Sequence, residues 1–234
     1  MNSERIYESY KMKETIIDCE DGTQTISSER FNELYHSKYG SIQESERVFI
    51  EIGYKQAMEI QKDLQILEIG FGTGLNALLT FLENSNNNNI YYTALEKYPL
   101  DTTTVEKLNF NQHLKIKNES ENIFLKLHTC MWNEWVVFGH FNLLKIEDDL
   151  LSIQFAKNQY DLVFFDAFAP EAQPEMWTIE IFTKIFEALK PNGILTTYCA
   201  KGIVKRNLKA VGFQVESLPG PIGKREITRA TKPL

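Results

Sequence analysis

The chain has 234 residues, of which 43% are hydrophobic and 24% are charged, and its formal net charge is −7. These values are typical of one soluble globular domain, and the acidic balance argues against a protein that coats nucleic acid. No apolar run approaches the roughly 20 residues that span a bilayer, and Met1–Arg5 lead into no apolar signal-peptide core. We therefore expect a cytoplasmic protein without membrane contact.

The cysteines and histidines argue against a metal centre. Cys19, Cys130 and Cys199 are far apart, and no C-x-x-C motif occurs. The four histidines are scattered, and no two of them have the spacing of a ligand pair on one helix. We therefore predict neither a disulfide nor a bound metal.

The first 60 residues lack the pattern of a nucleotide-binding unit. Residues 15–18 and 23–26 flank an Asp-Gly pair, which predicts a β-hairpin. Residues 42–60 have helical periodicity. Between these elements Tyr35 is a candidate substrate-binding residue, although such a segment is more often an ordered loop. We interpret residues 1–60 as an extension that covers the active site, and residues 61–234 as the main domain.

A glycine-rich stretch follows at Leu64–Asn76. An apolar strand over residues 64–69 leads into Gly70, Gly72 and Gly74, and then into an amphipathic helix. Strand, glycine turn and helix open a nucleotide-binding βαβ unit. Because Leu75 stands where a dinucleotide fingerprint needs glycine, the motif reads E-x-G-x-G-x-G from Glu68. It resembles motif I of the class I S-adenosylmethionine (SAM) methyltransferases.

Acidic residues follow the next two predicted strands. The second strand, residues 90–95, ends in Glu96, which can accept hydrogen bonds from ribose hydroxyls. A helix is expected over residues 100–111, and a helix with a loop within residues 112–140. The third strand, residues 141–146, leads to Asp148, and a short helix is expected to run through Phe155. Asp148 is the candidate ligand for the adenine amino group, and capping of that helix is an equal alternative.

The fourth strand, residues 160–165, is apolar throughout and leads to Asp166. Ligands of doubly wound sheets bind beyond the carboxyl ends of the strands, so Gly70 and Asp166 should lie close together. A carboxylate there can orient an amine and accept its proton, because alkylamines have a pKa near 10.4 and are mostly protonated at neutral pH. Phe168 and Pro170 add an apolar wall. Asp166 is therefore both the candidate catalytic residue and a candidate cofactor neighbour.

The remaining pattern predicts a mostly parallel sheet that an antiparallel hairpin completes. A helix is expected over residues 175–189, a turn over 190–193, a strand over 194–198 and a helix over 200–211. Two final strands follow, over residues 213–218 and 225–230. Residues 201–234 contain eight basic and two acidic side chains, so this end carries a charge of +6 on a body of −13. It is either a phosphate-binding patch or an ordinary solvated surface.

Stretches spread over nearly the whole chain resemble the methyltransferase domain of MnmC, which also occurs alone as MnmD. The most specific are Asp166–Pro170, Pro174–Trp177 and Gly223–Glu226, and the match extends to residues 35–49, 68–76, 96–100 and 196–213. The resemblance implies a SAM-dependent enzyme that methylates the wobble uridine of tRNA. It would convert the 5-aminomethyl-2-thiouridine to the 5-methylaminomethyl form.

The resemblance also assigns further residues. The cofactor site would include Thr73, Asn76 and Lys97. Asp166 and Phe168 would face the amine and the base, and Lys224 and Arg225 would lie near the RNA or the site. Because the wobble base is single-stranded, it can stack on an aromatic ring, for which Phe168 and Trp177 are candidates; Trp177 is equally well explained as a core residue.

In MnmC a flavin oxidoreductase domain follows the methyltransferase. Because this chain stops at Leu234, we expect that activity to be absent and a separate enzyme to supply the aminomethyl group.

Three other functions stay open. An aminopropyltransferase such as spermidine synthase shares the fold and uses an acid on an amine, but its acidic motif after the fourth strand differs from Phe-Ala-Pro. A methyltransferase of small amines would act without RNA. A SAM-binding module without catalysis is disfavoured by the complete set of acidic and glycine residues.

Overall fold

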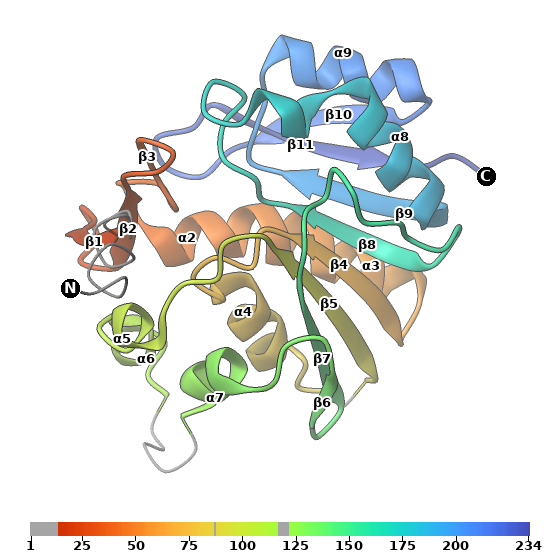
Figure 1. The fold of residues 1–234 in the computed structure, drawn as a ribbon. Helices are drawn as coiled ribbons and strands as arrows, with labels where there is room; N and C mark the ends of the chain where they lie inside the picture. Colours follow the sequence, from red (N-terminus) through yellow and green to blue (C-terminus); the bar gives the residue numbers. More distant parts are fainter. Residues whose placement is uncertain (1–13, 87, 117–121) are drawn as a thin grey trace, which may run out of the picture.

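The computed structural model describes residues 14–86, 88–116 and 122–234, and Figure 1 shows their arrangement. A central sheet of eight strands has helices on both faces (Figure 1). Its strands in chain order are β4 (Leu64–Ile69), β5 (Ile90–Glu96), β6 (Trp135–Phe138), β7 (Phe141–Glu147), β8 (Tyr160–Phe165), β9 (Leu189–Thr197), β10 (Gln214–Pro219) and β11 (Glu226–Thr231). Ahead of them, β1 (Glu14–Asp18), β2 (Gln24–Ser28) and β3 (Glu33–Leu34) form a small separate sheet.

The strand order of the large sheet is β10-β11-β9-β8-β4-β5-β7-β6. The five strands β9, β8, β4, β5 and β7 pair in parallel, and β11, β10 and β6 are antiparallel to their neighbours. The order reverses around β4, which pairs with β5 on one side and β8 on the other. This is the doubly wound arrangement predicted from the sequence, with the expected antiparallel hairpin. The fold class is therefore confirmed.

The helices form two layers. One long helix, composed of α2 (Ser41–Ser45), the π-helical η2 (Glu46–Tyr54) and α3 (Lys55–Ile60), lies with α4 (Leu75–Glu83) on one face. The same layer includes α5 (Thr102–Val105), α6 (Phe110–His113) and α7 (Ile123–Thr129). The 3-10 turn η4 (Pro174–Trp177), α8 (Ile179–Ala188) and α9 (Gly202–Val211) lie on the other face (Figure 1).

Alternation along the central strands explains why both layers are needed. In β4, Leu64 and Ile66 pack into the hydrophobic core on the face that α4 covers. Leu67 and Ile69 pack into the core on the opposite face, under α8. All six residues of β8 are buried, as expected of a central parallel strand. Burying a large aliphatic side chain contributes roughly 1.5–3 kcal/mol to the stability of the fold. Burial on both faces therefore stabilises the central strands of the sheet.

The predicted N-terminal hairpin is confirmed, because β1 and β2 pair antiparallel on either side of the Asp-Gly turn. The helix predicted over residues 42–60 is also confirmed, and it packs directly on the main sheet. The Phe49 and Phe164 ring centroids are 5.2 Å apart, and a Cβ on Gly53 would lie 3.1 Å from the Phe164 ring. The division of the chain at residue 60 stays a prediction. Residues 1–13 of the predicted extension lie outside the described residues.

Several predicted boundaries were wrong. The helix expected over 100–111 is two short helices, because the Asp101 carboxylate caps α5 and the chain turns after Val105. No helix follows Asp148; the Asp149 carboxylate instead accepts the Leu151 N–H in a turn. The helix expected from residue 175 begins only at Ile179, because Thr178 is extended and its hydroxyl accepts the Ile181 N–H.

Two strands were misjudged. The turn expected over 190–193 lies within β9, where Asn192 has a φ of 64° and the pairing with β8 shifts register. The region 112–140 does contain a helix, α7, but its last part forms β6 rather than a loop. Residues 117–121 of that predicted region lie outside the described residues.

Within the described residues no helix has both the length and the apolar character to cross a membrane. The same part of the chain contains no cluster of three or more His, Cys, Asp or Glu side chains arranged to hold a metal ion.

Candidate active site

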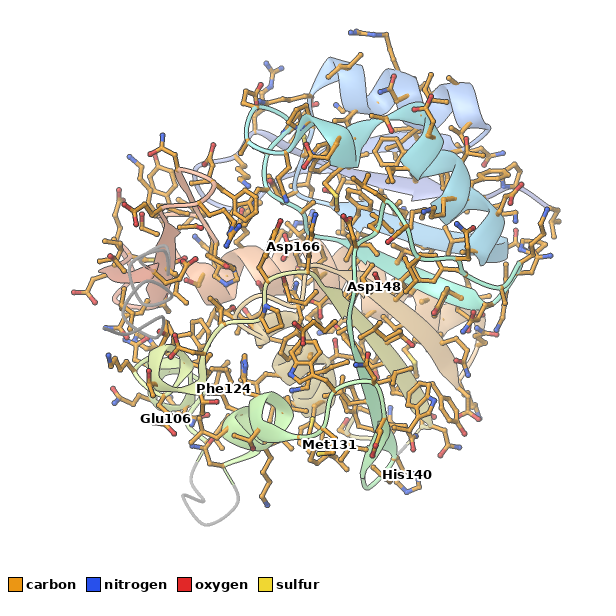
Figure 2. The ribbon with its side chains drawn as sticks, in the orientation of Figure 1. Glu106, Phe124, Met131, His140, Asp148 and Asp166 are labelled. Carbon is orange, nitrogen blue, oxygen red and sulfur yellow. The ribbon has the colours of Figure 1, made fainter. Side chains whose placement is uncertain are left out.

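A cavity of ≈ 340 Å³ opens at the carboxyl ends of β4, β5, β7 and β8. This volume is within the range of small-ligand sites. Asp166 and Asp148, which Figure 2 labels, lie on the walls of this same cavity. Of the predicted site residues, those on the wall are Tyr35, Gly70, Gly72, Thr73, Asn76, Glu96, Lys97, Asp148, Asp166, Phe168 and Lys224. The fold therefore brings most of the predicted set together.

The glycine loop needs glycine for two separate reasons. Gly70, Gly72 and Gly74 have φ angles of 88°, 48° and 70°, in the left-handed region that disfavours other residues. Space is also short, because a Cβ on Gly70 would lie 2.8 Å from the Asp166 carbonyl oxygen. Gly70 is therefore in close contact with the backbone that carries the candidate catalytic carboxylate. Gly74 does not line the cavity but precedes the first turn of α4.

Thr73 is held from two sides by histidines that come from distant parts of the chain. Its hydroxyl lies 2.7 Å from His36 Nε2, and its carbonyl oxygen lies 2.8 Å from His128 Nε2. Burial lowers the pKa of each histidine to about 4, so both rings are neutral at physiological pH. A neutral imidazole donates from one nitrogen, so His128 Nε2 donates its hydrogen to the Thr73 carbonyl. The glycine loop is thus held in place by the two segments that carry His36 and His128.

Glu96 is positioned by the loops it faces. Its Oε2 accepts the Gly72 N–H at 2.9 Å and its Oε1 accepts the Tyr98 N–H at 2.8 Å. Burial raises the pKa of this carboxyl, and the backbone hydrogen bonds oppose that shift. The carboxylate lines the cavity, and a carboxylate offers about four acceptor positions, so Glu96 can also accept a hydrogen bond from a ligand there.

The wall beyond Glu96 contains Lys97, Asp148 and Asp149. The Lys97 ammonium forms an ion pair with Asp149 at 2.7 Å. Asp148 Oδ1 accepts the Asp149 N–H at 2.7 Å and lies 3.4 Å from the Ser152 hydroxyl. These contacts order the turn that the sequence suggested was a helix start. Lys97 is exposed and paired, so its role toward a cofactor stays a proposal.

Asp166 lies at the base of the cavity and is partly exposed to it. Its Oδ2 accepts a hydrogen bond of 2.9 Å from Asn76 Nδ2. Burial and the nearby Glu44 charge raise the pKa of Asp166 to about 7, and the Asn76 hydrogen bond and the Lys224 charge lower it. A carboxyl with this pKa can both accept and release a proton near neutral pH.

Glu68 is placed differently from the prediction. It is fully buried, does not line the cavity, and accepts a 3.0 Å hydrogen bond from Asn76 Nδ2 through its Oε1. The motif alone does not distinguish a side chain that contacts the cofactor from one that is buried one layer below it. In the structure the hydrogen bond to Asn76 joins Glu68 to the cavity wall.

An aromatic wall faces Asp166. The Phe168 ring stacks on Phe31 with centroids 4.4 Å apart, and the edge of Tyr35 approaches it at 4.9 Å. The Phe168 N–H donates to Gln173 Oε1, and the Phe168 carbonyl accepts the Trp177 Nε1–H at 2.8 Å. Phe168 is therefore held by backbone and ring contacts alike.

Three of the predicted substrate residues lie away from the cavity. Trp177 is 3% exposed and packs against Phe165 and Phe182, so it supports Phe168 from the core and has no free face on which a base could stack. Pro170 and Arg225 do not line the cavity, and Arg225 is exposed.

Lys224 lines the cavity wall. Its ammonium pairs with Glu44 at 2.5 Å and lies 3.9 Å above the Tyr198 ring. Together these groups close the side of the cavity next to Asp166.

The sequence reasoning missed Phe31 and His128 entirely. Both lie in segments without a recognisable motif, and their partners, Phe168 and Thr73, are 137 and 55 residues away in the chain. Only the folded chain brings these pairs together, so no local pattern could have identified them.

The fold and this site together define the class. A glycine loop after the first sheet strand, an acid at the end of the second and a final antiparallel hairpin are the arrangement of class I SAM methyltransferases. Residues 91–233 match the family described as S-adenosyl-L-methionine-dependent methyltransferase. This match covers more than half of the chain, so the chain belongs to that family.

Curated relatives narrow the relationship. MnmC of Leptospira interrogans, named tRNA 5-methylaminomethyl-2-thiouridine biosynthesis bifunctional protein, is 31% identical over 212 residues, which are 86% of this chain and 32% of the relative. MnmC of Nitrosospira multiformis is 30% identical over 232 residues, 93% of this chain and 37% of the relative. The chain thus spans about a third of the length of these relatives. The resemblance to the methyltransferase domain of MnmC is confirmed.

Solved structures confirm the fold. MnmC2 from Aquifex aeolicus superposes with a TM-score of 0.73 at 24% identity, covering 98% of this chain and 78% of that one. Spermidine synthase from Thermotoga maritima gives a TM-score of 0.61 at 15% identity and covers 94% and 69%. At these identities both similarities concern the fold alone.

Proposed function

We propose that this protein transfers a methyl group from SAM to the aminomethyl nitrogen on the wobble uridine of tRNA. The product would be 5-methylaminomethyl-2-thiouridine, the nucleoside in the name of the MnmC relatives. The observation that carries the proposal is the Asp166 carboxylate, which lies between the glycine loop and an aromatic wall in one cavity. The glycine loop can accommodate a nucleoside cofactor, the carboxylate can bind an amine, and the aromatic wall can stack on a base.

The residues around the cavity fit SAM. Glu96 has acceptor positions left for the ribose hydroxyls, and Asp148 offers a carboxylate for the adenine amino group. The glycines allow the loop backbone to approach the methionine portion closely. When bound, SAM supplies an electrophilic methyl group on a positively charged sulfur, and the negative Asp166 suits such a neighbour.

Asp166 prepares the nucleophile. The aminomethyl group enters as an ammonium, and it must lose a proton before its nitrogen has a lone pair to attack with. Asp166 accepts an N–H of the amine as a hydrogen bond, takes up that proton, and later releases it to solvent. Holding the nitrogen in place contributes further, because oriented reactants can gain roughly 7–11 kcal/mol over free encounter.

The aromatic wall would receive the uracil ring. Single-stranded bases stack on aromatic side chains with about 1–3 kcal/mol per base, and Phe168 is the fixed ring next to Asp166. Tyr35 borders the same space, and Lys224 brings a positive charge to it. We place the reaction in the cytoplasm, where a separate enzyme would introduce the aminomethyl group.

A single incubation tests this proposal. The protein is mixed with SAM and with tRNA that carries the aminomethyl group but lacks the terminal methyl, and the digested nucleosides are identified by mass. We expect the wobble nucleoside to gain one methyl group with SAM and nothing with decarboxylated SAM. Methylation of free small amines in place of tRNA, or aminopropyl transfer, would contradict the assignment.

A further inference from the structure

Three side chains form a row that runs from the cavity wall into the core. Glu68 comes from β4, Asn76 from α4, and Asp166 follows β8. Asn76 Nδ2 donates one hydrogen to Glu68 Oε1 at 3.0 Å and the other to Asp166 Oδ2 at 2.9 Å. An amide nitrogen has two hydrogens, so both are used on two carboxyl groups.

This row makes the two oxygens of Asp166 unequal. Oδ2 is held by Asn76, whereas Oδ1 accepts no hydrogen bond from the described residues. The side chain lines the cavity, so its free oxygen remains available to a ligand there. Fixing one carboxyl oxygen also fixes the direction of the other.

Glu68 and Asn76 are themselves held firmly. Glu68 is fully buried in a strand that pairs with a neighbour on each side, and Asn76 is 3% exposed at the start of α4. Thr80 Oγ1 donates to the Asn76 carbonyl oxygen at 2.7 Å and ties the same backbone to the next turn. Glu68 does not line the cavity, and Asn76, although on its wall, uses both amide hydrogens on the two carboxyl groups.

Glu68 is best described as a neutral acid. Its carboxyl is buried beside the Tyr92 side chain of β5 and has no positively charged partner in the described residues, a position that suits a protonated carboxyl better than a charge. Burial accordingly raises the pKa of Glu68 well above its usual value. Its Oε1 can therefore orient Asn76 without adding a second negative charge beside Asp166.

We propose that Asn76 and Glu68 are positioning residues for methyl transfer. Glu68 orients the Asn76 amide, Asn76 holds Asp166 Oδ2, and Asp166 Oδ1 is thereby directed at the methyl-accepting nitrogen. This inference rests on the proposed function for its substrate but not for its geometry. It replaces the predicted cofactor contact of Glu68 with a role that acts through Asp166.

The proton balance follows from this arrangement. An N–H of the incoming ammonium gives its proton to Asp166 Oδ1, and the nitrogen keeps the electron pair. That pair forms the new N–C bond as the methyl–sulfur bond breaks, and sulfur retains the bonding electrons. Asp166 then loses its proton to solvent, so one proton is released for each methyl group transferred.

The test is a titration of Asp166 in the full chain without ligand, followed by carboxyl ¹³C NMR. Removing the Asn76 amide in Asn76→Leu should move the Asp166 midpoint upward by about 1 pH unit, because a donor that stabilises the carboxylate is lost. Asn76→Ser, which is smaller, serves if the leucine variant does not fold. Glu68→Leu should shift the midpoint in the same direction, whereas Glu68→Gln, which keeps an acceptor oxygen, should move it by less than about 0.3 pH unit.

Thr80→Val is the matched control, because it removes a buried hydrogen bond from the same turn without touching a carboxyl group. An unchanged midpoint in the Asn76 variants, or an equal shift in Thr80→Val, would overturn the proposal. The other groups that interact with Asp166 are unchanged in these variants; they are Glu44 from α2, Tyr92 from β5, Tyr198 after β9 and Lys224 from the β10–β11 loop.

Activity provides a second readout. The pH at which methyl transfer reaches half its maximum should rise in Asn76→Leu by the same amount as the NMR midpoint. If wild type methylates no tRNA, the proposed function fails while the titration still tests the positioning. If wild type is active and the NMR midpoint stays fixed in the Asn76 variants, only the positioning fails.

Discussion

Replacing Asp166 with asparagine should stabilise the protein, and the gain should grow with pH. The variant keeps an oxygen for the Asn76 hydrogen bond but removes a carboxyl whose pKa is raised from 3.8 to about 7. Because the folded protein resists ionisation of this group, the unfolded chain loses the proton first. The penalty on folding is therefore absent below pH 3.8, grows between the two pKa values, and is complete above pH 7.

The magnitude follows from the shift. About 3 pKa units at 1.36 kcal/mol each give a ceiling of about 4 kcal/mol, and the opening to the cavity reduces this to about 2 kcal/mol. At pH 5 the unfolded state has lost its proton and the folded state has not, so roughly half of the full penalty is already present. We thus expect a gain of about 1 kcal/mol at pH 5 and about 2 kcal/mol at pH 8.

Urea unfolding of both proteins at several pH values, without SAM, measures this difference directly. Asp149→Asn is the matched control, since Asp149 lies on the same cavity but its pKa is lowered, with Lys97 as its ion-pair partner. That variant should gain no stability toward high pH. Wild type and Asp166→Asn curves that run parallel from pH 5 to pH 8 would refute the reasoning.

Three further predictions concern ligand affinity. Thr73→Val should weaken SAM binding about tenfold by calorimetry, because His36 loses its partner in the loop, whereas Thr73→Ser should bind normally. Glu96→Gln should also weaken SAM binding at least tenfold, because an acceptor facing the ribose and the Gly72 N–H is lost; unchanged affinity would mean that Glu96 is structural. Phe168→Leu should raise the KM for tRNA about tenfold and leave the Kd for SAM unchanged, because the ring that stacks on the base is lost. Phe168→Tyr keeps a ring and should behave like the wild type. An equal loss of affinity for tRNA and for SAM would count against base stacking.

The sequence predicted the layers of the fold well because their signals are local and strong. The apolar run at Leu64–Ile69 and the buried run at Tyr160–Phe165 could only be central strands, and the intervening glycines located the turn. The predicted bounds of the short helices were wrong. Asp101 and Thr178 each impose a helix start that competes with a longer periodic pattern, and propensity alone cannot decide between them.

The site was predictable where a residue ends a strand, as Glu96 does, or directly follows one, as Asp166 does. It was not predictable where the role of a residue depends on whether its side chain reaches the cavity or is buried below the cavity wall. Glu68 and Trp177 stand in motifs that contain wall residues, yet both are buried beneath the wall. A motif fixes neighbours along the chain, whereas access to the cavity depends on which side of the sheet or turn each side chain faces.

The cavity walls combine residues from both ends of the described chain. Phe31, Tyr35 and Glu44 come from its first part, and Lys224 comes from its last part. A nascent chain that has not yet reached Lys224 lacks the ion pair with Glu44 and one wall beside Asp166. Lys224 therefore links the segment after β10 to the wall that Glu44 forms, and the shape of the cavity beside Asp166 depends on both segments.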